Sequence, residues 1–192
     1  MIAIVDYGAG NVFSVQCALE RLGANSVLTK DPEVLLKAEK VLFPGVGHAK
    51  AAMEALKENG LDQVLKELSV PILGICLGMQ LMCLRTQEGD TQGLGIFPVE
   101  VRNFPVGLPV PHMGWNSLEA LSGPLFKGIA KETDFYFVHS FYAEPSPYTT
   151  ATTEYNELFS AALEKDNYFA VQFHPEKSGA EGEKLLQNFL KL

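Results

Sequence analysis

The sequence predicts an α/β protein with a mostly parallel central sheet, flanking helices and an additional β-rich second half. Three observations support this prediction. The first half of the 192-residue chain alternates short apolar runs with stretches of helical periodicity, the second half carries short β-type runs between turn residues, and the last stretch is helical again. Repeated strand–helix units form parallel sheets that helices cover on both faces.

The chain opens with a strand and a helix. Residues 2–5 form a continuous apolar run that ends at Asp6, which is typical of a fully buried strand. Apolar residues then recur at helical spacing until Gly23, where we expect the helix to end. The positions on this helical face are Val12, Val15, Ala18, Leu19 and Leu22.

Further elements lead to Cys76. We expect a strand at 40–43 that is broken by Pro44-Gly45, helices at 49–59 and 61–68, and a strand at 71–75. In parallel α/β sheets, sites form beyond the carboxyl ends of the strands. One edge of the sheet should therefore carry the segments that follow these ends, namely Asp6-Tyr7-Gly8, Pro44-Gly45-Val46-Gly47 and Cys76.

The second half contains little helical periodicity before the carboxyl terminus. The predicted strands are 135–138, 148–153, 159–163 and 168–173, and a closing helix is marked by Leu185, Leu186, Phe189 and Leu190. We expect these strands to extend or flank the central sheet. Because there is no internal repeat, low-complexity tract or linker, residues 1–192 are predicted to form a single domain with a sizeable core.

Composition narrows the partners and the compartment. A net charge of −8 without any run of Lys or Arg argues against nucleic acid or an anionic membrane surface as the main partner. Three cysteines are too few for a disulfide framework. Asp6 interrupts the apolar start, and glycines interrupt the longest apolar stretch, 70–84, so neither a signal peptide nor a membrane span is expected. The predicted location is the cytoplasm.

Cys76 is the first candidate catalytic residue. Gly74 and Gly78 flank it at two residues on either side, as in a tight strand-to-helix turn where larger side chains would collide. Such a turn places the sulfur at a helix amino terminus, where backbone amides favour the thiolate. A cysteine in an apolar stretch is also a common packing residue, so this motif alone leaves both interpretations open.

His174 and Glu176 supply a candidate base and its orienting group. His174 directly follows a β-type run, so we expect it at a strand end, and Pro175 restricts the backbone after it. Glu176 is close enough in sequence to accept a hydrogen bond from the imidazole and hold its tautomer. A surface turn is the alternative for this tripeptide by itself. Together with Cys76, the three residues indicate a nucleophilic acyl-transfer site.

Acyl transfer also requires hydrogen-bond donors for the developing oxyanion. The backbone amide of Leu77, directly after the nucleophile, is one candidate. The second should come from a neighbouring strand end, and Pro44-Gly45-Val46-Gly47 is suited because its glycines let the backbone approach closely. The alternative for this segment is an ordinary turn.

Nothing in the sequence indicates a cofactor or a metal. Gly8-Ala9-Gly10 follows a strand, but Phe13 occupies the third glycine position of a dinucleotide fingerprint. His48, His112 and His139 show no metal-ligand spacing. Trp115 is either a core aromatic residue or an interface anchor. Cys17 and Cys83 are expected in the core.

At this point the sequence resembles a known family, the class I (triad) glutamine amidotransferases, which have a flavodoxin-like sheet. The resemblance rests on Gly74-Ile75-Cys76-Leu77-Gly78-Met79-Gln80 and Phe173-His174-Pro175-Glu176. Within this family, the resemblance is to the glutaminase subunits of imidazole glycerol phosphate synthase in histidine biosynthesis. The segments that carry it are Asp6-Tyr7-Gly8-Ala9-Gly10-Asn11, Pro44-Gly45-Val46-Gly47, 111–116, Tyr136-Phe137-Val138-His139-Ser140 and Pro175-Glu176-Lys177-Ser178.

The resemblance implies roles for individual residues. Cys76 would attack the side-chain amide of glutamine, His174 would transfer the proton, and Glu176 would orient His174. Val46 and Leu77 would provide the oxyanion amides. The residues implied to hold the amino-acid end of glutamine are Gly45, Gln80, Ser140 and Phe141. Departures from the family pattern are His48-Ala49 and Phe141, which could alter loop packing.

A partner subunit is also implied. A (βα)₈ barrel needs about 250 residues, so this chain has no room for one and an ammonia acceptor must be on another polypeptide. By the resemblance, that partner is a barrel cyclase that forms imidazole glycerol phosphate and aminoimidazole carboxamide ribotide in a heterodimer. The residues that match family positions at the interface are Asn11, Trp115, Tyr136 and Lys177.

Three other functions remain open at this stage. The glutaminase of pyridoxal phosphate synthesis has a similar size and the same triad, although Met113-Gly114-Trp115-Asn116 favours histidine biosynthesis. A chaperone or peptidase of the same broad fold would lack the downstream His-Pro-Glu. A non-catalytic regulatory subunit is disfavoured because the triad residues are intact.

Overall fold

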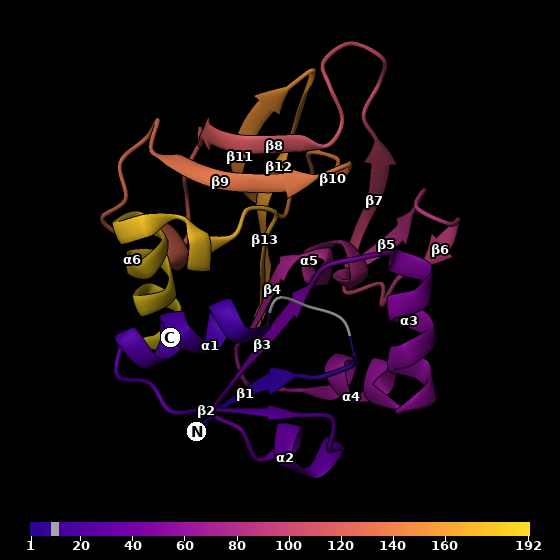
Figure 1. Ribbon diagram of the computed structural model, residues 1–192, viewed down its shortest axis with the longest axis vertical. Coiled ribbons are helices and arrows are strands. Elements are labelled where there is room, and N and C mark those ends of the chain that lie inside the picture. The colour runs from indigo at the N-terminus through magenta and orange to yellow at the C-terminus, as the bar shows by residue number, and fades with distance from the viewer. Residues whose placement is uncertain (9–11) are drawn as a thin grey trace.

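The computed structural model describes residues 1–8 and 12–192 and has the expected α/β architecture (Figure 1). Its strands are β1 (Ile2–Val5), β2 (Ser26–Thr29), β3 (Lys40–Gly45), β4 (Ile72–Cys76), β5 (Cys83–Thr86), β6 (Thr91–Gln92), β7 (Phe97–Asn103), β8 (His112–Ser117), β9 (Asp134–His139), β10 (Phe141–Ala143), β11 (Thr149–Tyr155), β12 (Glu157–Lys165) and β13 (Tyr168–Val171). Its helices are α1 (Val12–Arg21), α2 (Pro32–Leu36), α3 (Ala49–Glu58), α4 (Leu61–Glu67), α5 (Leu77–Met82) and α6 (Gly179–Leu190), with short 3₁₀ turns at Pro124–Phe126 and Pro175–Lys177.

A parallel five-strand core organises the molecule. Its order is β2-β1-β3-β4-β13, and the remaining strands of this sheet, β12-β10-β7-β5-β6 with β11 on β12, continue from β13. Gly45 of β3 pairs with Cys76 of β4, and Val171 of β13 pairs with Ile75. This register brings the carboxyl ends of β3, β4 and β13 to one edge, which is where parallel sheets form their sites.

Helices cover both faces of the parallel core. One buried cluster joins the sheet to α2, α3, α4 and α5, and a second joins it to α1 and α6. Figure 1 shows α1 and α6 together on one side and α3 and α4 on the other. The separate two-stranded sheet, β8 with β9, lies over the edge at which β4 and β13 end. None of the helices in the described ranges is long and apolar enough to cross a membrane.

The predicted break at Pro44-Gly45 is wrong, because β3 continues through both residues. Its pairing with β1 runs from Lys40 to Leu42, whereas its pairing with β4 extends to Gly45. Pro44 therefore lies where no neighbour on the β1 side requires its missing N–H, which is the position at which a strand tolerates proline.

Other differences concern short elements. The helix that follows Cys76 ends at Met82, and the chain turns directly into β5, so Cys83 is buried in a strand. The strand predicted at 168–173 ends at Val171. Neither β2 nor α2 was predicted, although α2 carries a recognisable signal: Asp31 caps it by accepting a hydrogen bond from the Glu33 amide at 2.9 Å, and Pro32 follows.

Candidate active site

The turn at Cys76 is the centre of the site. Cys76 ends β4 and directly precedes α5, with φ 54° and ψ −109°, a conformation that non-glycine residues rarely adopt. Such strain persists only where the surrounding structure over-determines the backbone, and it concentrates at functional sites. The side chain is buried, with 7% exposure. The turn thus holds the sulfur at the carboxyl edge of the sheet.

Two glycines make this turn possible. A Cβ atom at Gly78 would lie 1.8 Å from the Phe43 carbonyl oxygen of β3, and one at Gly74 would lie 2.6 Å from the Met82 sulfur. The first obstacle is backbone and cannot move aside as a flexible side chain would. The expected collision is therefore present, and α5 can pack this closely on β3 only because residue 78 lacks a side chain.

His174 and Glu176 form a buried pair beside the turn. Their side chains are 2% and 1% exposed, and His174 Nδ1 lies 2.8 Å from Glu176 Oε1. A carboxylate only accepts, so Nδ1 donates and Nε2 is the nitrogen left for chemistry. Within the described residues, neither His174 Nε2 nor the second carboxylate oxygen of Glu176, Oε2, has a hydrogen-bond partner.

The charge of His174 is set by its two neighbours. Burial alone lowers its pKa, but Cys76 and the Glu176 carboxylate outweigh burial and raise the pKa of His174 to about 10. At neutral pH the imidazole is therefore protonated, between the Cys76 sulfur and the Glu176 carboxylate. A protonated imidazole beside a cysteine favours the thiolate, which is the form in which a cysteine acts as a nucleophile.

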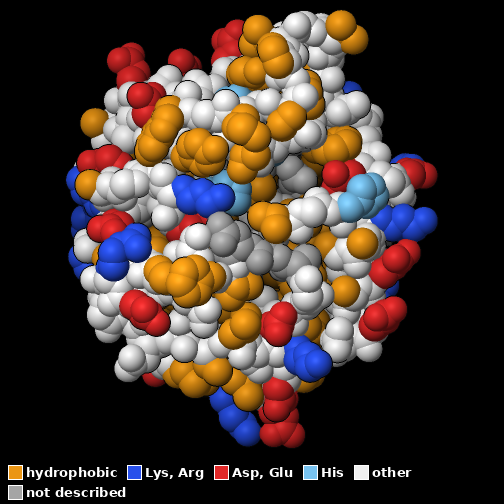
Figure 2. Space-filling view, in the orientation of Figure 1, with side chains coloured by type: hydrophobic (Ala, Val, Ile, Leu, Met, Phe, Trp, Pro, Cys, Tyr) orange, Lys and Arg blue, Asp and Glu red, His pale blue; other side chains and the backbone are white. Residues whose placement is uncertain are grey.

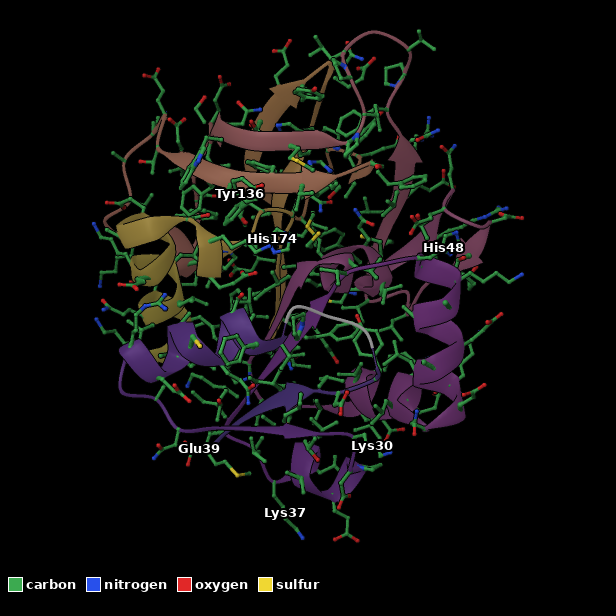
Figure 3. All side chains as sticks on the ribbon, viewed as in Figure 1. Lys30, Lys37, Glu39, His48, Tyr136 and His174 are labelled. Atoms are coloured by element: carbon green, nitrogen blue, oxygen red, sulfur yellow. The ribbon has the colours of Figure 1, made fainter. Side chains whose placement is uncertain are left out.

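Strand β9 holds both candidate catalytic residues in place. The His174 amide donates to the Tyr136 carbonyl at 2.9 Å, and the Tyr136 amide donates to Ser178 Oγ, which in turn donates to the His174 carbonyl at 2.6 Å. Two residues along β9, the Val138 carbonyl oxygen lies 3.6 Å from the Cys76 sulfur. Figure 3 shows Tyr136 next to His174. Sequence reasoning did not find Ser178 as a support.

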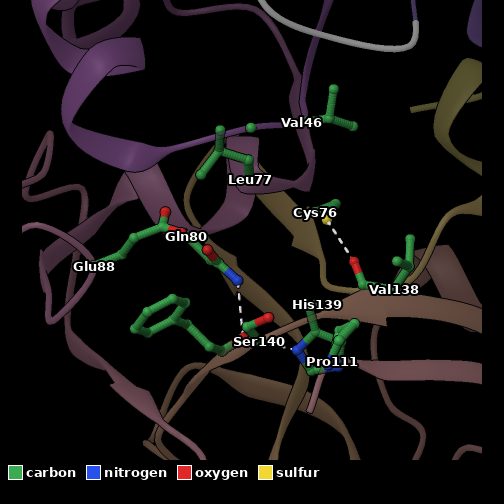
Figure 4. Close-up of a pocket in the computed structure, with 11 residues that line it drawn as sticks. Val46, Cys76, Leu77, Gln80, Glu88, Pro111, Val138, His139 and Ser140 are labelled. Atoms are coloured by element: carbon green, nitrogen blue, oxygen red, sulfur yellow. Dashed lines mark hydrogen bonds between the residues drawn. The ribbon is translucent and has the colours of Figure 1, made fainter.

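A cavity of about 290 Å³ opens in front of the sulfur (Figure 4). Its lining residues are Val46, Gly47, Cys76, Leu77, Gln80, Glu88, Pro111, Val138, His139, Ser140 and Phe141. Five of the predicted oxyanion and glutamine-binding residues are among them. Gly45 is not: it lies behind the wall, where a Cβ would come 2.2 Å from the Tyr7 hydroxyl.

The two candidate oxyanion segments lie side by side. The pairing of Gly45 with Cys76 brings Val46 and Leu77 next to one another at the cavity. Tyr7, which is buried, donates its hydroxyl to the Pro44 carbonyl at 3.0 Å and supports the end of β3. Leu77 begins α5, and the first amides of a helix have no acceptor within it. Leu77 therefore offers a backbone amide to a ligand, and Val46 lines the same cavity.

Glu88 is a site residue that sequence reasoning missed. It is the one acidic side chain among the residues that line the cavity, and its Oε2 accepts from the Ala49 amide at the start of α3, 2.7 Å away. Nothing local distinguishes Glu88 from other surface carboxylates, because its partner is 39 positions away in sequence. It adds a carboxyl group to a cavity wall that is otherwise made of apolar and neutral polar residues and a histidine.

Three predicted interface residues cluster on the outer surface. The rings of Trp115 and Tyr136 meet edge-on at 5.9 Å, and the Lys177 ammonium lies 6.0 Å from the Tyr136 ring centre. Trp115 is 57% exposed and is therefore no core residue. Figure 2 shows hydrophobic side chains gathered across this face. The fourth, Asn11, lies outside the described residues.

Comparison with known proteins places these features in a family context. Residues 3–192 match the family described as glutamine amidotransferase class-I. The imidazole glycerol phosphate synthase subunit HisH of Bacteroides fragilis is 53% identical, with 100% of this chain and 99% of the relative covered. The subunit of the same name from Yersinia pseudotuberculosis is 48% identical with the same coverage.

Solved structures agree on the fold. A crystal structure of a glutamine amidotransferase superposes with a TM-score of 0.78 at 20% identity, covering 100% of this chain and 98% of the other. The structure of PurLQS from Thermotoga maritima gives 0.71 at 19% identity, with 99% and 97% covered. At such identities the likeness concerns the fold alone.

Proposed function

The chain belongs to the class I glutamine amidotransferase family, and within it to the HisH subunits of imidazole glycerol phosphate synthase, and we propose that it hydrolyses glutamine to glutamate and ammonia for histidine biosynthesis. The observation that carries this proposal is the strained Cys76 turn, which opens onto a cavity and lies against a buried His174–Glu176 pair. A relationship to HisH subunits at about half identity leaves no reason to prefer the pyridoxal phosphate branch.

In the first half of the proposed reaction, the Cys76 thiolate attacks the side-chain carbonyl carbon of glutamine. The carbonyl oxygen becomes an oxyanion, which the amides of Val46 and Leu77 stabilise. His174, protonated because its pKa is raised, gives its Nε2 proton to the leaving nitrogen. The carbon–nitrogen bond breaks, ammonia leaves, and a thioester joins Cys76 to the glutamyl group.

In the second half, neutral His174 accepts a proton from water as the water attacks the thioester. A second oxyanion forms at the same two amides and collapses with cleavage of the carbon–sulfur bond. Glutamate leaves, and the thiolate and the imidazolium are restored. Glu176 keeps Nδ1 protonated throughout, so that Nε2 faces the reacting atoms in both steps.

The cavity wall suggests how the amino-acid end of glutamine is held. We assign Glu88 to the α-ammonium group, because it is the acidic side chain of the wall. Gln80, Ser140 and Phe141 remain the proposed contacts to the rest of the amino-acid end. Gly45 acts indirectly, by letting β3 pass close to Tyr7 and α5.

We propose that this chain forms one domain over residues 1–192. The proposed ammonia acceptor is a (βα)₈-barrel cyclase subunit that forms a heterodimer with it. We propose that the barrel docks on the face of Trp115, Tyr136 and Lys177, which lies directly outside the His174 loop. Asn11 stays a proposed contact from sequence. The three cysteines are free thiols, which fits the proposed cytoplasmic location.

An electrophilic glutamine analogue tests the mechanism. The full-length chain is treated with the analogue, with and without the barrel cyclase, and the adduct is located by mass spectrometry. We expect a single adduct on Cys76 that cyclase accelerates and that Cys76→Ala abolishes, with Cys83→Ala as the control that keeps it. Labelling elsewhere, or labelling that survives Cys76→Ala, would refute the proposal.

A further inference from the structure

Two buried histidines meet beside the active site. His112 of β8 and His139 of β9 are directly opposite one another in the β8–β9 pairing, 27 positions apart in sequence. Their exposures are 3% and 5%, and His112 Nδ1 lies 2.9 Å from His139 Nε2. The mechanism proposed above uses neither ring.

The two histidines separate the cavity in front of Cys76 from a groove on the outer surface. His139 lines the cavity in front of Cys76. His112 lines a groove on the outer surface together with Trp115 and Asn116. A hydrogen bond between the two rings therefore connects the proposed docking face to the proposed glutamine pocket.

The direction of this hydrogen bond follows from its ends. His139 Nδ1 lies 2.7 Å from the Phe141 carbonyl, which can only accept, so Nδ1 carries the hydrogen and Nε2 of the neutral ring accepts. His112 must then donate from Nδ1, which leaves its Nε2 to accept from the Asn116 amide at 3.4 Å. Both rings are thus assigned the Nδ1–H tautomer.

The surroundings keep both rings uncharged. Burial lowers the pKa of His112 to about 4 and that of His139 to about 3. The His112 ring stacks on Tyr155 and Phe137, with centroids 4.0 Å and 4.9 Å away. A second proton on either ring would also place two donors face to face, since each nitrogen already has a partner.

The chain of hydrogen bonds continues to the nucleophile. The Phe141 carbonyl also accepts from the Gln80 side-chain amide at 2.9 Å (Figure 4). The same amide donates to Gln172 Oε1 at 2.9 Å, and the Gln172 amide reaches the Cys76 sulfur at 3.7 Å. The Gln80 nitrogen is thus engaged by protein acceptors, which leaves its oxygen as the group that can accept from a ligand.

We propose that His112 and His139 are positioning residues of the glutamine site, an uncharged pair that fixes the Phe141 carbonyl and, through it, the Gln80 side chain. The proposal rests on the proposed glutaminase function and extends it to two residues outside the triad. Because His112 touches the outer groove and not the cavity, its effect on glutamine must pass through His139.

The tautomers are read directly by ¹⁵N NMR of the imidazole rings at neutral pH. We expect both histidines as the Nδ1–H form, which is the minority tautomer of a free imidazole in water. In His112→Phe, which keeps a stacking ring but removes the donor, the His139 Nε2 signal should shift as it loses its hydrogen bond. An Nε2–H form at either residue of the wild-type chain would overturn the proposal, whatever the enzyme activity.

Steady-state glutaminase assays, with the barrel cyclase present, test the consequence. We expect His112→Phe to raise KM for glutamine about fivefold, the size of one lost hydrogen bond, with a smaller effect on kcat. His112→Asn retains a donor at the position of Nδ1 and should restore most of the loss. Equal KM values for the Phe variant and the wild type, or equal losses in both variants, would contradict the proposal.

A third measurement separates this proposal from the proposed function. Alkylation of Cys76 by iodoacetamide needs no contact with the amino-acid end of glutamine, and Phe141, Gln80 and Gln172 separate Cys76 from His139 in the hydrogen-bond chain. The alkylation rate should therefore change much less than KM in both variants. If the wild-type complex hydrolyses no glutamine, the proposed function fails, while the tautomer assignment is still decided by NMR. If alkylation slows in His112→Phe by as much as KM rises, the pair supports the nucleophile and not the glutamine pocket, and the proposal is refuted.

Discussion

At the scale of single residues, the properties of His174 come from two neighbours that oppose its burial. The imidazole is almost fully enclosed, yet its pKa is raised to about 10 because the Cys76 sulfur and the Glu176 carboxylate lie beside it. In the proposed mechanism, the raised pKa keeps a proton on the ring for transfer to the leaving ammonia. The same balance makes the charge of His174 dependent on Cys76.

Removing the sulfur should therefore reverse the pKa shift. In Cys76→Ala we expect the pKa of His174 to fall from about 10 by more than one unit, because burial then opposes Glu176 alone. An NMR titration of the imidazole from pH 5 to pH 11 measures this change. A pKa that stays near its wild-type value would mean that Cys76 is not an anion next to His174.

The same shift has a stability consequence with a definite sign. A folded-state pKa above the unfolded value of 6.5 stabilises the fold fully below pH 6.5, and this stabilisation is lost as the pH rises toward 10. Urea unfolding between pH 6 and pH 10 should show a steeper loss for the wild type than for Cys76→Ala. Parallel curves would contradict this expectation.

Substitutions of Glu88 can distinguish the effect of its charge from the effect of its hydrogen bond to the Ala49 amide. Glu88→Gln keeps an oxygen for the Ala49 amide but removes the charge proposed to bind the α-ammonium group. We expect KM for glutamine to rise roughly 10- to 100-fold, as for the loss of a charged hydrogen bond, with unchanged stability. Glu88→Ala should add a loss of about 1 kcal/mol in unfolding free energy. A normal KM in Glu88→Gln would exclude the assigned role.

At the scale of elements, the site depends on how closely α5 packs on the sheet. Gly78→Ala would place a Cβ 1.8 Å from a backbone carbonyl of β3, so α5 must move and take the Cys76 turn with it. We expect a loss of about 3 kcal/mol in unfolding free energy, together with a large loss of glutaminase activity. Ala51→Ser on the exposed side of α3 is the control, and equal stability of the two variants would contradict the packing argument.

Strand β9 contacts several parts of the candidate active site. Its backbone contacts His174 and Cys76, and the side chain of its last residue, His139, contacts the Phe141 carbonyl at the proposed glutamine pocket. Its outer side carries Tyr136, which is part of the proposed docking face. A partner that displaces β9 would therefore act on the base, the nucleophile and the substrate pocket together.

At the scale of the whole molecule, the docking face and the site lie at the same end. Because the proposed ammonia acceptor is a separate subunit, we expect low glutaminase activity alone and higher activity with the barrel cyclase. Trp115→Ala should weaken cyclase binding about 30-fold, as for an aromatic hot spot of about 2 kcal/mol. Titration calorimetry measures this change, with Leu36→Ala on α2, at the far end of the molecule, as the control (Figure 1). Full activity without the partner, or unchanged binding by the Trp115 variant, would contradict the expectation.

The sequence by itself determined the local features of this protein. The strand into Cys76, the glycines that flank the turn, and the ends of α1 and α3 are marked by neighbouring residues, and each can be predicted from spacing. The atom that a side chain at residue 78 would meet, the Phe43 carbonyl oxygen, lies on another strand and is known only from the fold. The fold class and the family relationship follow in the same way, because they depend on the order of such local signals along the chain. The strand β2 escaped prediction because its four residues do not form a continuous apolar run, as the four residues of β1 do.

The tertiary structure alone decided the contacts between distant residues. Glu88 reaches the start of α3, and His112 meets His139 only because β8 pairs with β9 in one register. The protonation of His174 likewise depends on a sulfur 98 positions away in sequence. Such contacts leave no local pattern, since the interaction energy depends on distance and burial in space and not on separation along the chain.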